Sequence, residues 1–119
     1  MNELFNPGHI HYSAGVRLEF AARNLNPLFF LIRHFSGDWG DVSSEERQEN
    51  EENLASGGRL FSRYNAPFGE LWIVTTDDRT ETFMCFPDQY MAWATGCREE
   101  KSSAASLLRK PPFGKPSSN

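Results

Sequence analysis

The stretch that decides the fold is RLFSRYNAPFGELWIVTTDDRTETFMCFP, residues 59–87. It holds three runs in which β-branched, aromatic and aliphatic residues are frequent, at 59–64, 70–76 and 80–86. Turn-forming residues separate the runs at 65–69 and 76–79, a pattern typical of short strands in an antiparallel meander. Pro87 stops the last strand, because proline cannot donate a ladder hydrogen bond. We therefore expect a small antiparallel sheet of three strands, or at most four.

Two amphipathic helices are expected ahead of this sheet, after a short β-prone stretch at residues 10–12. Ser13 can cap the first helix, whose predicted apolar face is Ala14, Leu18, Ala21, Ala22 and Leu25. Asn26-Pro27 begins the second helix, in which spacings of three, four and seven predict a buried face of Leu28, Leu31, Ile32 and Phe35. Packed on one face of the sheet, these helices would give a two-layer α+β domain.

A third helix of different character is expected from residue 43 to about residue 55. Ser43 followed by Glu46 forms a capping box, and Ser56-Gly57-Gly58 ends the helix. Only Leu54 and Ala55 near its end are apolar. We therefore expect an acidic helix that lies on the surface and is held by its ends rather than by an apolar stripe.

Composition and length predict one folded domain, residues 1–90, followed by a polar tail, residues 91–119. The chain has 119 residues, of which 39% are hydrophobic, and its ten Phe, three Trp and three Tyr can build one core. The tail holds three prolines within residues 111–116, which exclude regular structure there, and we expect the tail to be disordered. Its five basic and two acidic residues from position 98 onward give a charge of +3.

The sequence shows neither a signal peptide nor an apolar run of the roughly 18 residues that a membrane span requires, so we expect a cytoplasmic protein with no membrane contact. Cys85 and Cys97 lie in different settings and form no C-x-x-C motif, and both are expected to be free thiols. Motifs for phosphate loops, serine hydrolases and zinc proteases are absent from the sequence. No cofactor is therefore expected, and the chain is more readily explained as a protein without enzymatic activity.

Residues 4–90 resemble a family of short bacterial proteins, many of them carried on plasmids and integrative elements. The matching residues recur along the chain in order: Leu4-Phe5, Gly8, Ala14-Gly15, Arg33-His34, Gly37-Asp38-Trp39-Gly40-Asp41, Gly58-Arg59-Leu60, Ser62, Tyr64, Trp72-Ile73-Val74-Thr75, Asp78-Arg79-Thr80, Thr82 and residues 87–90. The resemblance implies a role in counter-defence or plasmid maintenance rather than in metabolism. It implies no catalytic residue.

The acidic stretch 38–52 is the first candidate site, with seven acids against Arg47 alone and a local charge of −6. Carboxylates spaced along a surface helix could occupy a basic groove built for nucleic acid, whereas the plainer interpretation is a solvated helix. The turn before the helix could be a recognition loop, or its Trp could pack over the core. Direct binding of nucleic acid is not expected. The predicted partner-binding residues are Asp38, Trp39, Asp41, Glu45, Glu46, Glu49 and Glu52.

Basic and imidazole side chains supply two further candidates. Arg59, Arg63 and Arg79 could converge on an anion or simply form ion pairs. His9 and His11 share a strand face, and His34 could join them at a metal, but without a convincing third ligand we expect ordinary half-buried histidines and no metal.

Three functional hypotheses follow. The first is a non-enzymatic accessory protein of a mobile genetic element that binds a host or defence protein, for example as an anti-CRISPR or anti-restriction inhibitor. The second is a small enzyme or toxin that acts on nucleic acid through the three arginines and a histidine. The third is a homo-oligomeric structural module that pairs through an exposed strand. The sequence leaves the oligomeric state open.

Overall fold

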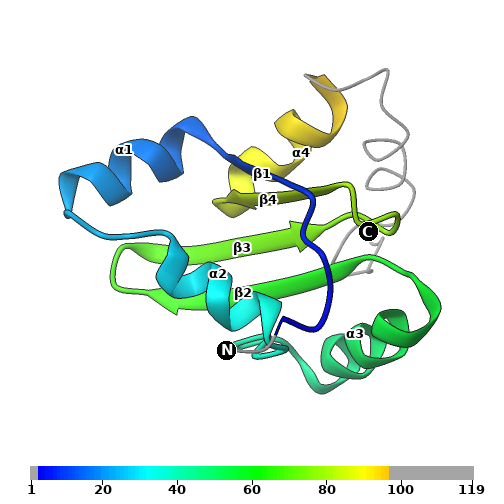
Figure 1. Ribbon diagram of the computed structural model, residues 1–119. Coiled ribbons are helices and arrows are strands. Elements are labelled where there is room, and N and C mark those ends of the chain that lie inside the picture. Colours follow the sequence, from blue (N-terminus) through cyan, green and yellow to red (C-terminus); the bar gives the residue numbers. More distant parts are fainter. Residues whose placement is uncertain (1–2, 97–119) are drawn as a thin grey trace.

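The computed structural model describes residues 3–96 (Figure 1). Along the chain these residues form β1 (His9–Tyr12), α1 (Ala14–Ala22), α2 (Leu28–Phe35), α3 (Ser44–Ser56), β2 (Leu60–Ala66), β3 (Gly69–Thr75), β4 (Glu81–Cys85) and α4 (Pro87–Gly96). The helix α4 continues across the predicted domain boundary at Tyr90. The remainder of the predicted tail, with Cys97, lies outside the described residues.

The α+β prediction is confirmed, and the sheet has four strands in the order β1-β4-β3-β2. The meander is present as expected, because β2 pairs with β3, and β3 with β4, in antiparallel register. The fourth strand, β1, pairs with β4 in parallel, with His9 opposite Glu81 and Tyr12 opposite Met84. The sheet is therefore mixed, which the expectation of a purely antiparallel sheet missed.

Both faces of the sheet are buried, whereas one buried face was expected. Helices α1 and α2 lie on one face (Figure 1), where the core contains Val16, Phe20, Phe30, Leu31, Phe35, Tyr64, Leu71, Ile73 and Met84. The other core contains Trp39, Val42, Leu60, Phe61, Trp72, Val74, Phe83, Cys85 and Tyr90. Consistent with this, residues 71–76 are all buried, as a continuous apolar run requires of a strand covered on both sides.

The predicted faces of the first two helices were wrong in part. Helix α1 is capped by Ser13, whose hydroxyl accepts from the Val16 amide at 3.1 Å, as expected. However, α1 buries Val16 and Phe20, while Leu18 is 72% exposed. Helix α2 buries Leu31 and Phe35 as predicted, but together with Phe30 and His34 rather than with Leu28 and Ile32. Each helix is thus rotated about its axis relative to the expected orientation.

The start of α4 is tied to the start of α1. The Gln89 side chain accepts a hydrogen bond from the Ser13 hydroxyl, and its Oε1 also lies 3.4 Å from the Phe86 amide. A Cβ on Gly15 would lie 2.5 Å from Gln89 Nε2, so glycine at this helical position is explained by packing. Within residues 3–96 the structure contains no helix with the length and apolarity needed to cross a membrane.

Candidate functional site

The acidic helix α3 lies beside the edge strand β2 and is attached to it through its middle (Figure 1). Asn50, which is 2% exposed, donates from Nδ2 to the Phe61 carbonyl at 2.7 Å and accepts from the Phe61 amide at 3.0 Å. One side chain thereby satisfies the backbone N–H and C=O of a strand residue that faces no further strand. The prediction that only the ends anchor this helix was therefore wrong.

Two further polar residues share the inner face of α3 with Asn50. Asn53 donates to the Arg59 carbonyl at 2.7 Å, and both Glu46 oxygens accept from Arg63 at 3.1 and 3.2 Å. Residues 46, 50 and 53 follow the i, i+4, i+7 spacing that places side chains on one helix face. This inner stripe is polar, so a search for hydrophobic periodicity could not find it. The capping box between Ser43 and Glu46 is present as predicted.

Trp39 packs in the core and does not form a recognition surface. Its side chain is fully buried, and its Nε1 donates to Glu51 Oε2 at 3.0 Å. Its ring lies edge-on to the His34 imidazole, with 5.6 Å between centroids. Trp39 is therefore not available to contact a partner, and the interpretation in which it packs over the core is the correct one.

The backbone that follows Trp39 extends the sheet locally at β2. Gly40 forms an isolated parallel bridge with Arg63, and the Asp41 amide donates to the Arg63 carbonyl at 2.6 Å. Gly40 has φ +79, and a Cβ there would lie 2.2 Å from that carbonyl, so only glycine allows this approach. The Asp41 carboxylate accepts from the Asn65 amide at 3.0 Å, and the turn is therefore fixed to the strand.

The predicted acidic residues separate into inward-facing and exposed groups. Glu46 is engaged by Arg63, and Glu49 is half-buried. Glu51, which was not among the predicted residues, is exposed and accepts from Trp39. The exposed members are Asp38, Asp41, Glu45 and Glu52, which we call the acidic face. Arg33 donates to Asp38 at 2.8 Å, and this hydrogen bond holds the pKa of that carboxyl below its usual range. The acidic face therefore combines exposed carboxylates with a rigid support.

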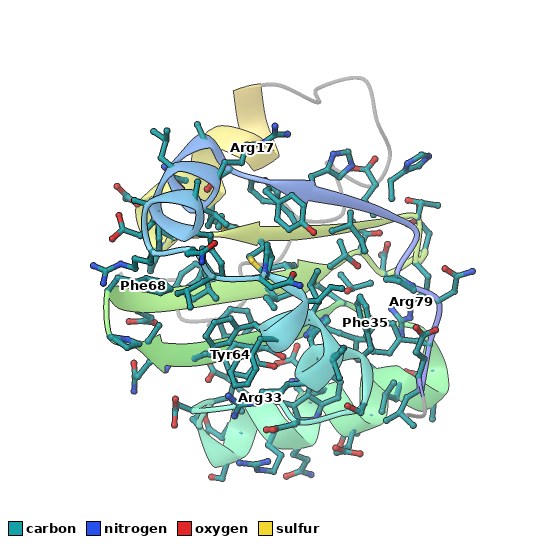
Figure 2. All side chains as sticks on the ribbon, turned by 60° about the vertical axis from the view of Figure 1, so that its left-hand side comes forward. Arg17, Arg33, Phe35, Tyr64, Phe68 and Arg79 are labelled. Atoms are coloured by element: carbon teal, nitrogen blue, oxygen red, sulfur yellow. The ribbon has the colours of Figure 1, made fainter. Side chains whose placement is uncertain are left out.

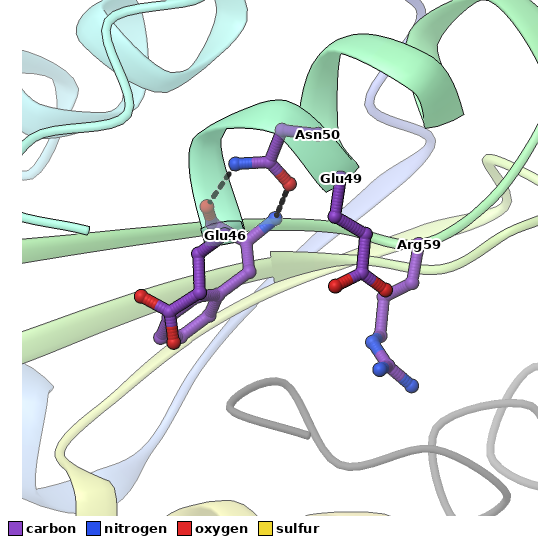
Figure 3. Close-up of a pocket in the computed structure, with 5 residues that line it drawn as sticks. Glu46, Glu49, Asn50 and Arg59 are labelled. Carbon is purple, nitrogen blue, oxygen red and sulfur yellow. Dashed lines mark hydrogen bonds between the residues drawn. The ribbon is translucent and has the colours of Figure 1, made fainter. Parts of the chain in front are cut away.

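A small cavity of about 10 Å³ lies under α3, between Glu46, Glu49, Asn50, Arg59 and Phe61 (Figure 3). Its volume is near the least that one water molecule needs, and four of its five lining residues carry polar side chains. Figure 3 shows the Glu49 carboxylate close to the Arg59 side chain, beside the Asn50 hydrogen bonds. The cavity is too small for a substrate and is best understood as a water site in the α3 attachment.

The three candidate arginines serve separate structural contacts. Arg79 donates to the carbonyls of Gly58 at 2.6 Å and Asn53 at 2.9 Å, and so binds the C-terminal end of α3. Arg63 lies between Glu46 and Glu70, each at 3.1 Å. Arg59 is only 8% exposed. Arg63 and Arg79 are thus held by different sets of acceptors, which argues against a shared anion-binding cluster.

The histidines also lie apart. His9 and His11 neighbour each other, with 6.3 Å between ring centroids, and His11 Nε2 is 3.5 Å from Glu81 Oε1. His34 is buried on the face covered by α1 and α2 and does not join them. Within residues 3–96, no group of three or more His, Cys, Asp or Glu side chains is placed to hold a metal ion.

His34 belongs to a hydrogen-bonded chain that crosses the sheet. Its Nδ1 is 2.6 Å from Ser62 Oγ, its Nε2 is 2.9 Å from Thr75 Oγ1, and Thr75 Oγ1 is 2.7 Å from Thr82 Oγ1. The Thr82 hydroxyl donates to the Pro7 carbonyl at 2.7 Å. Because that carbonyl can only accept, the Thr82 oxygen must accept from the Thr75 hydroxyl, and the Thr75 oxygen must accept from His34 Nε2. His34 therefore carries its proton on Nε2, and Ser62 donates to Nδ1.

This chain does not form a reactive serine–histidine pair. Ser62 and His34 are both fully buried, so a substrate cannot reach the hydroxyl. Burial, together with the positive charge of the nearby Arg79, lowers the pKa of His34 to about 3. Burial likewise raises the pKa of the Cys85 thiol, which makes that residue unreactive as a nucleophile. These buried groups stabilise the core instead.

Comparison of the chain with protein-family models, with curated protein sequences and with solved structures finds no match. The resemblance to plasmid-borne and integrative-element proteins therefore stays a prediction. The candidate site is an acidic surface formed by the polar helix α3 and the turn before it. The inner stripe of Glu46, Asn50 and Asn53, which attaches α3 to the edge of the sheet, is what the sequence-based search missed.

Proposed function

We propose that this protein is a non-enzymatic, cytoplasmic accessory protein of a mobile genetic element, and that it binds a host or defence protein through the acidic face. The observation that carries the proposal is the way α3 is held. Polar contacts attach its inner stripe, Glu46, Asn50 and Asn53, to the edge of the sheet. The exposed acids are then presented from a helix, and from the turn before it, whose positions are fixed by contacts of the helix's inner face and C-terminal end and by the bridge of the turn to β2.

A rigid acidic surface suits a partner with a basic groove. Residues 38–52 carry a charge of −6, and exposed carboxylates of this density attract Lys- and Arg-lined surfaces by long-range electrostatics. Fixing their positions before binding lowers the entropy cost of association. Such a groove is typical of proteins that hold nucleic acid, which agrees with an inhibitor of a defence nuclease complex. The resemblance to mobile-element proteins supports the same setting.

The other two hypotheses receive less support. The arginines invoked for a nucleic-acid enzyme are engaged by backbone carbonyls and carboxylates. Pairing of copies through β2 would compete with Asn50 and with the Gly40 bridge, both of which occupy that edge. The sheet edge at β1 is the alternative route for a homo-oligomer, and light scattering would detect it.

A capture experiment with matched charge reversals tests the proposal. Tagged wild-type protein would be used to retain proteins from a bacterial lysate at physiological salt, and the same protein would be assayed for its effect on plasmid transfer. Glu52→Lys reverses an exposed carboxylate that accepts from the residue four positions earlier, Gln48. Glu19→Lys is the control, because Glu19 accepts from Arg23 in the same i, i+4 manner on α1. The proposal expects Glu52→Lys to lose the partner and Glu19→Lys to keep it.

A further inference from the structure

A surface groove of about 480 Å³ lies between the tip of the β2–β3 hairpin and the start of α4. The groove is lined by the rings of Phe68, Phe86 and Pro87 and by the side chains of Glu70, Asp88 and Gln89. Phe68 is seen in Figure 2 at the hairpin end of the molecule. None of these residues belongs to the acidic face, so the groove is a separate feature that the proposed function does not use.

The floor of the groove is aromatic and fixed in place. The Phe68 and Phe86 rings meet edge to face with 6.0 Å between centroids, and Phe68 also packs on the buried Phe20 ring at 5.2 Å. The Arg23 guanidinium already lies 5.1 Å from the Phe68 ring centroid. Cations are attracted to the faces of aromatic rings, and Phe68 already makes one such contact with Arg23, which does not itself line the groove.

Two carboxylates flank the aromatic floor. The Glu70 side chain is 40% exposed, and its Oε2 accepts a hydrogen bond from Trp72 Nε1 at 2.8 Å and lies 3.1 Å from Arg63 Nε in an ion pair. Among residues 3–91, the exposed Asp88 carboxylate makes no hydrogen bond or ion pair. The groove thus offers acceptor oxygens on two sides of an apolar surface.

We propose that this groove binds the arginine side chain of an extended, basic segment of a partner protein. A guanidinium is planar and carries five N–H donors, so it can stack on one of the two aromatic rings while donating to the carboxylates of Glu70 and Asp88. A lysine ammonium is a compact charge and cannot do both. The groove is open along its length, which suits a side chain projecting from a peptide better than a small molecule that must be enclosed.

The wall that carries Asp88 is rigid. Its neighbour Gln89 is bound by the Ser13 hydroxyl and fills the space that Gly15 leaves open. Asp88 also stands in the first turn of α4, where a carboxylate is favoured by the helix dipole. Both features keep the carboxylate in position without a ligand.

NMR titration of the full chain with short capped peptides tests this inference. The probe is Gly-Arg-Gly, and the controls are Gly-Lys-Gly and Gly-citrulline-Gly, the last being a neutral isostere of the probe. We expect Gly-Arg-Gly to shift the amides of Gly69, Glu70, Asp88 and Gln89 with a dissociation constant of about 1 mM, as suits one charged side chain. We expect about tenfold weaker binding to Asp88→Asn and unchanged binding to Glu3→Gln, an exposed acid elsewhere.

Three results would overturn the inference. If the lysine or citrulline peptide bound as tightly as Gly-Arg-Gly, the groove would not recognise the guanidinium group. If Gly-Arg-Gly still shifted the amide signals of the Asp88→Asn and Glu70→Gln variants, the peptide would bind outside this groove. If no peptide bound and the protein formed a dimer that the substitution Asp88→Asn dissociated, the occupant of the groove would be a second copy of the chain. None of these results bears on the acidic face, whose variants are assayed separately.

Discussion

The Asn50 side chain forms hydrogen bonds with both the backbone N–H and the backbone C=O of Phe61, as a neighbouring β-strand would. Its Nδ2 lies 2.7 Å from the Phe61 carbonyl oxygen, and its Oδ1 lies 3.0 Å from the Phe61 nitrogen. A helix without an apolar stripe is thereby held against a sheet edge that would otherwise be open. This attachment both protects the edge and fixes the carboxylates on the opposite side of the helix.

Replacing Asn50 with Ala or Leu should destabilise the protein by about 2–3 kcal/mol, because two buried backbone groups of Phe61 lose their partners. Urea denaturation of the full chain would measure the change in the free energy of unfolding. Gln48→Ala, on the exposed side of the same helix, is the control and should change that free energy by less than about 0.5 kcal/mol. Equal effects of the two substitutions would refute the attachment through Asn50.

Arg79→Ala should lower stability by about 2 kcal/mol, since the carbonyls of Asn53 and Gly58 would lose a charged donor. Arg79→Lys should recover only part of this loss, because an ammonium cannot reproduce the fork geometry of the guanidinium. Thermal unfolding would rank the three proteins. If Arg79→Ala were as stable as wild type, Arg79 would not stabilise the end of α3, and the hypothesis that it binds an anion would again be the better explanation.

Stability should fall as the pH drops from about 6.5 toward 3, partly through His34. Burial lowers the folded-state pKa of His34 to about 3, so below the ordinary value of about 6.5 the unfolded chain binds a proton that the folded chain does not. Each pH unit in this window then costs up to about 1.4 kcal/mol. Chemical denaturation between pH 7 and pH 5 would give the slope, which should be smaller in His34→Gln and unchanged in His9→Gln.

The direction of the hydrogen-bonded chain predicts which ring nitrogen of His34 carries the proton. The Pro7 carbonyl accepts from Thr82, and the sequence of donors that follows places the proton on Nε2. Nitrogen-15 chemical shifts of the imidazole at neutral pH would identify this tautomer. If the Nδ1–H form were detected, the donor and acceptor of every hydrogen bond in the chain would be exchanged. The Thr82 hydroxyl could then no longer donate to the Pro7 carbonyl, which would contradict the structure.

The corrected orientation of α1 predicts opposite results for two apolar residues two positions apart. Val16→Ala should destabilise the protein by about 2 kcal/mol because it opens a cavity in the core. Leu18→Ala should change stability by less than about 0.5 kcal/mol because that side chain is mostly solvated. Equilibrium unfolding of both variants would measure the two changes in the free energy of unfolding. A larger loss of stability in Leu18→Ala than in Val16→Ala would support the buried face expected from the sequence.

Local signals in the sequence were sufficient for the strands, turns and caps. Ser13 and Ser43 each cap the helix expected of them, because capping depends on residues within one turn. The orientation of α1 was missed because the helix has two candidate apolar stripes, one through Leu18 and one through Val16 and Phe20. Only packing against the sheet decides between them, and periodicity does not encode that packing.

Long-range polar contacts were the least predictable part of the molecule. The parallel pairing of β1 with β4 joins residues far apart in sequence, and the inner stripe of α3 carries no hydrophobic signal. The acidic residues themselves were found from charge alone, but their division into inward-facing and exposed members was not. That division follows in part from Arg63, which engages Glu46 from another element.

The central claim is that α3 presents its outer acids to a partner protein. The most direct test compares the proteins captured from a bacterial lysate by wild type, by Glu45→Lys/Glu52→Lys and by Glu19→Lys, with each variant first shown to unfold at the same denaturant concentration as wild type. We predict one protein that wild type and Glu19→Lys retain and that Glu45→Lys/Glu52→Lys loses, with capture weakened by added salt. A captured protein that all three retain equally would contradict the claim, as would the absence of any captured protein.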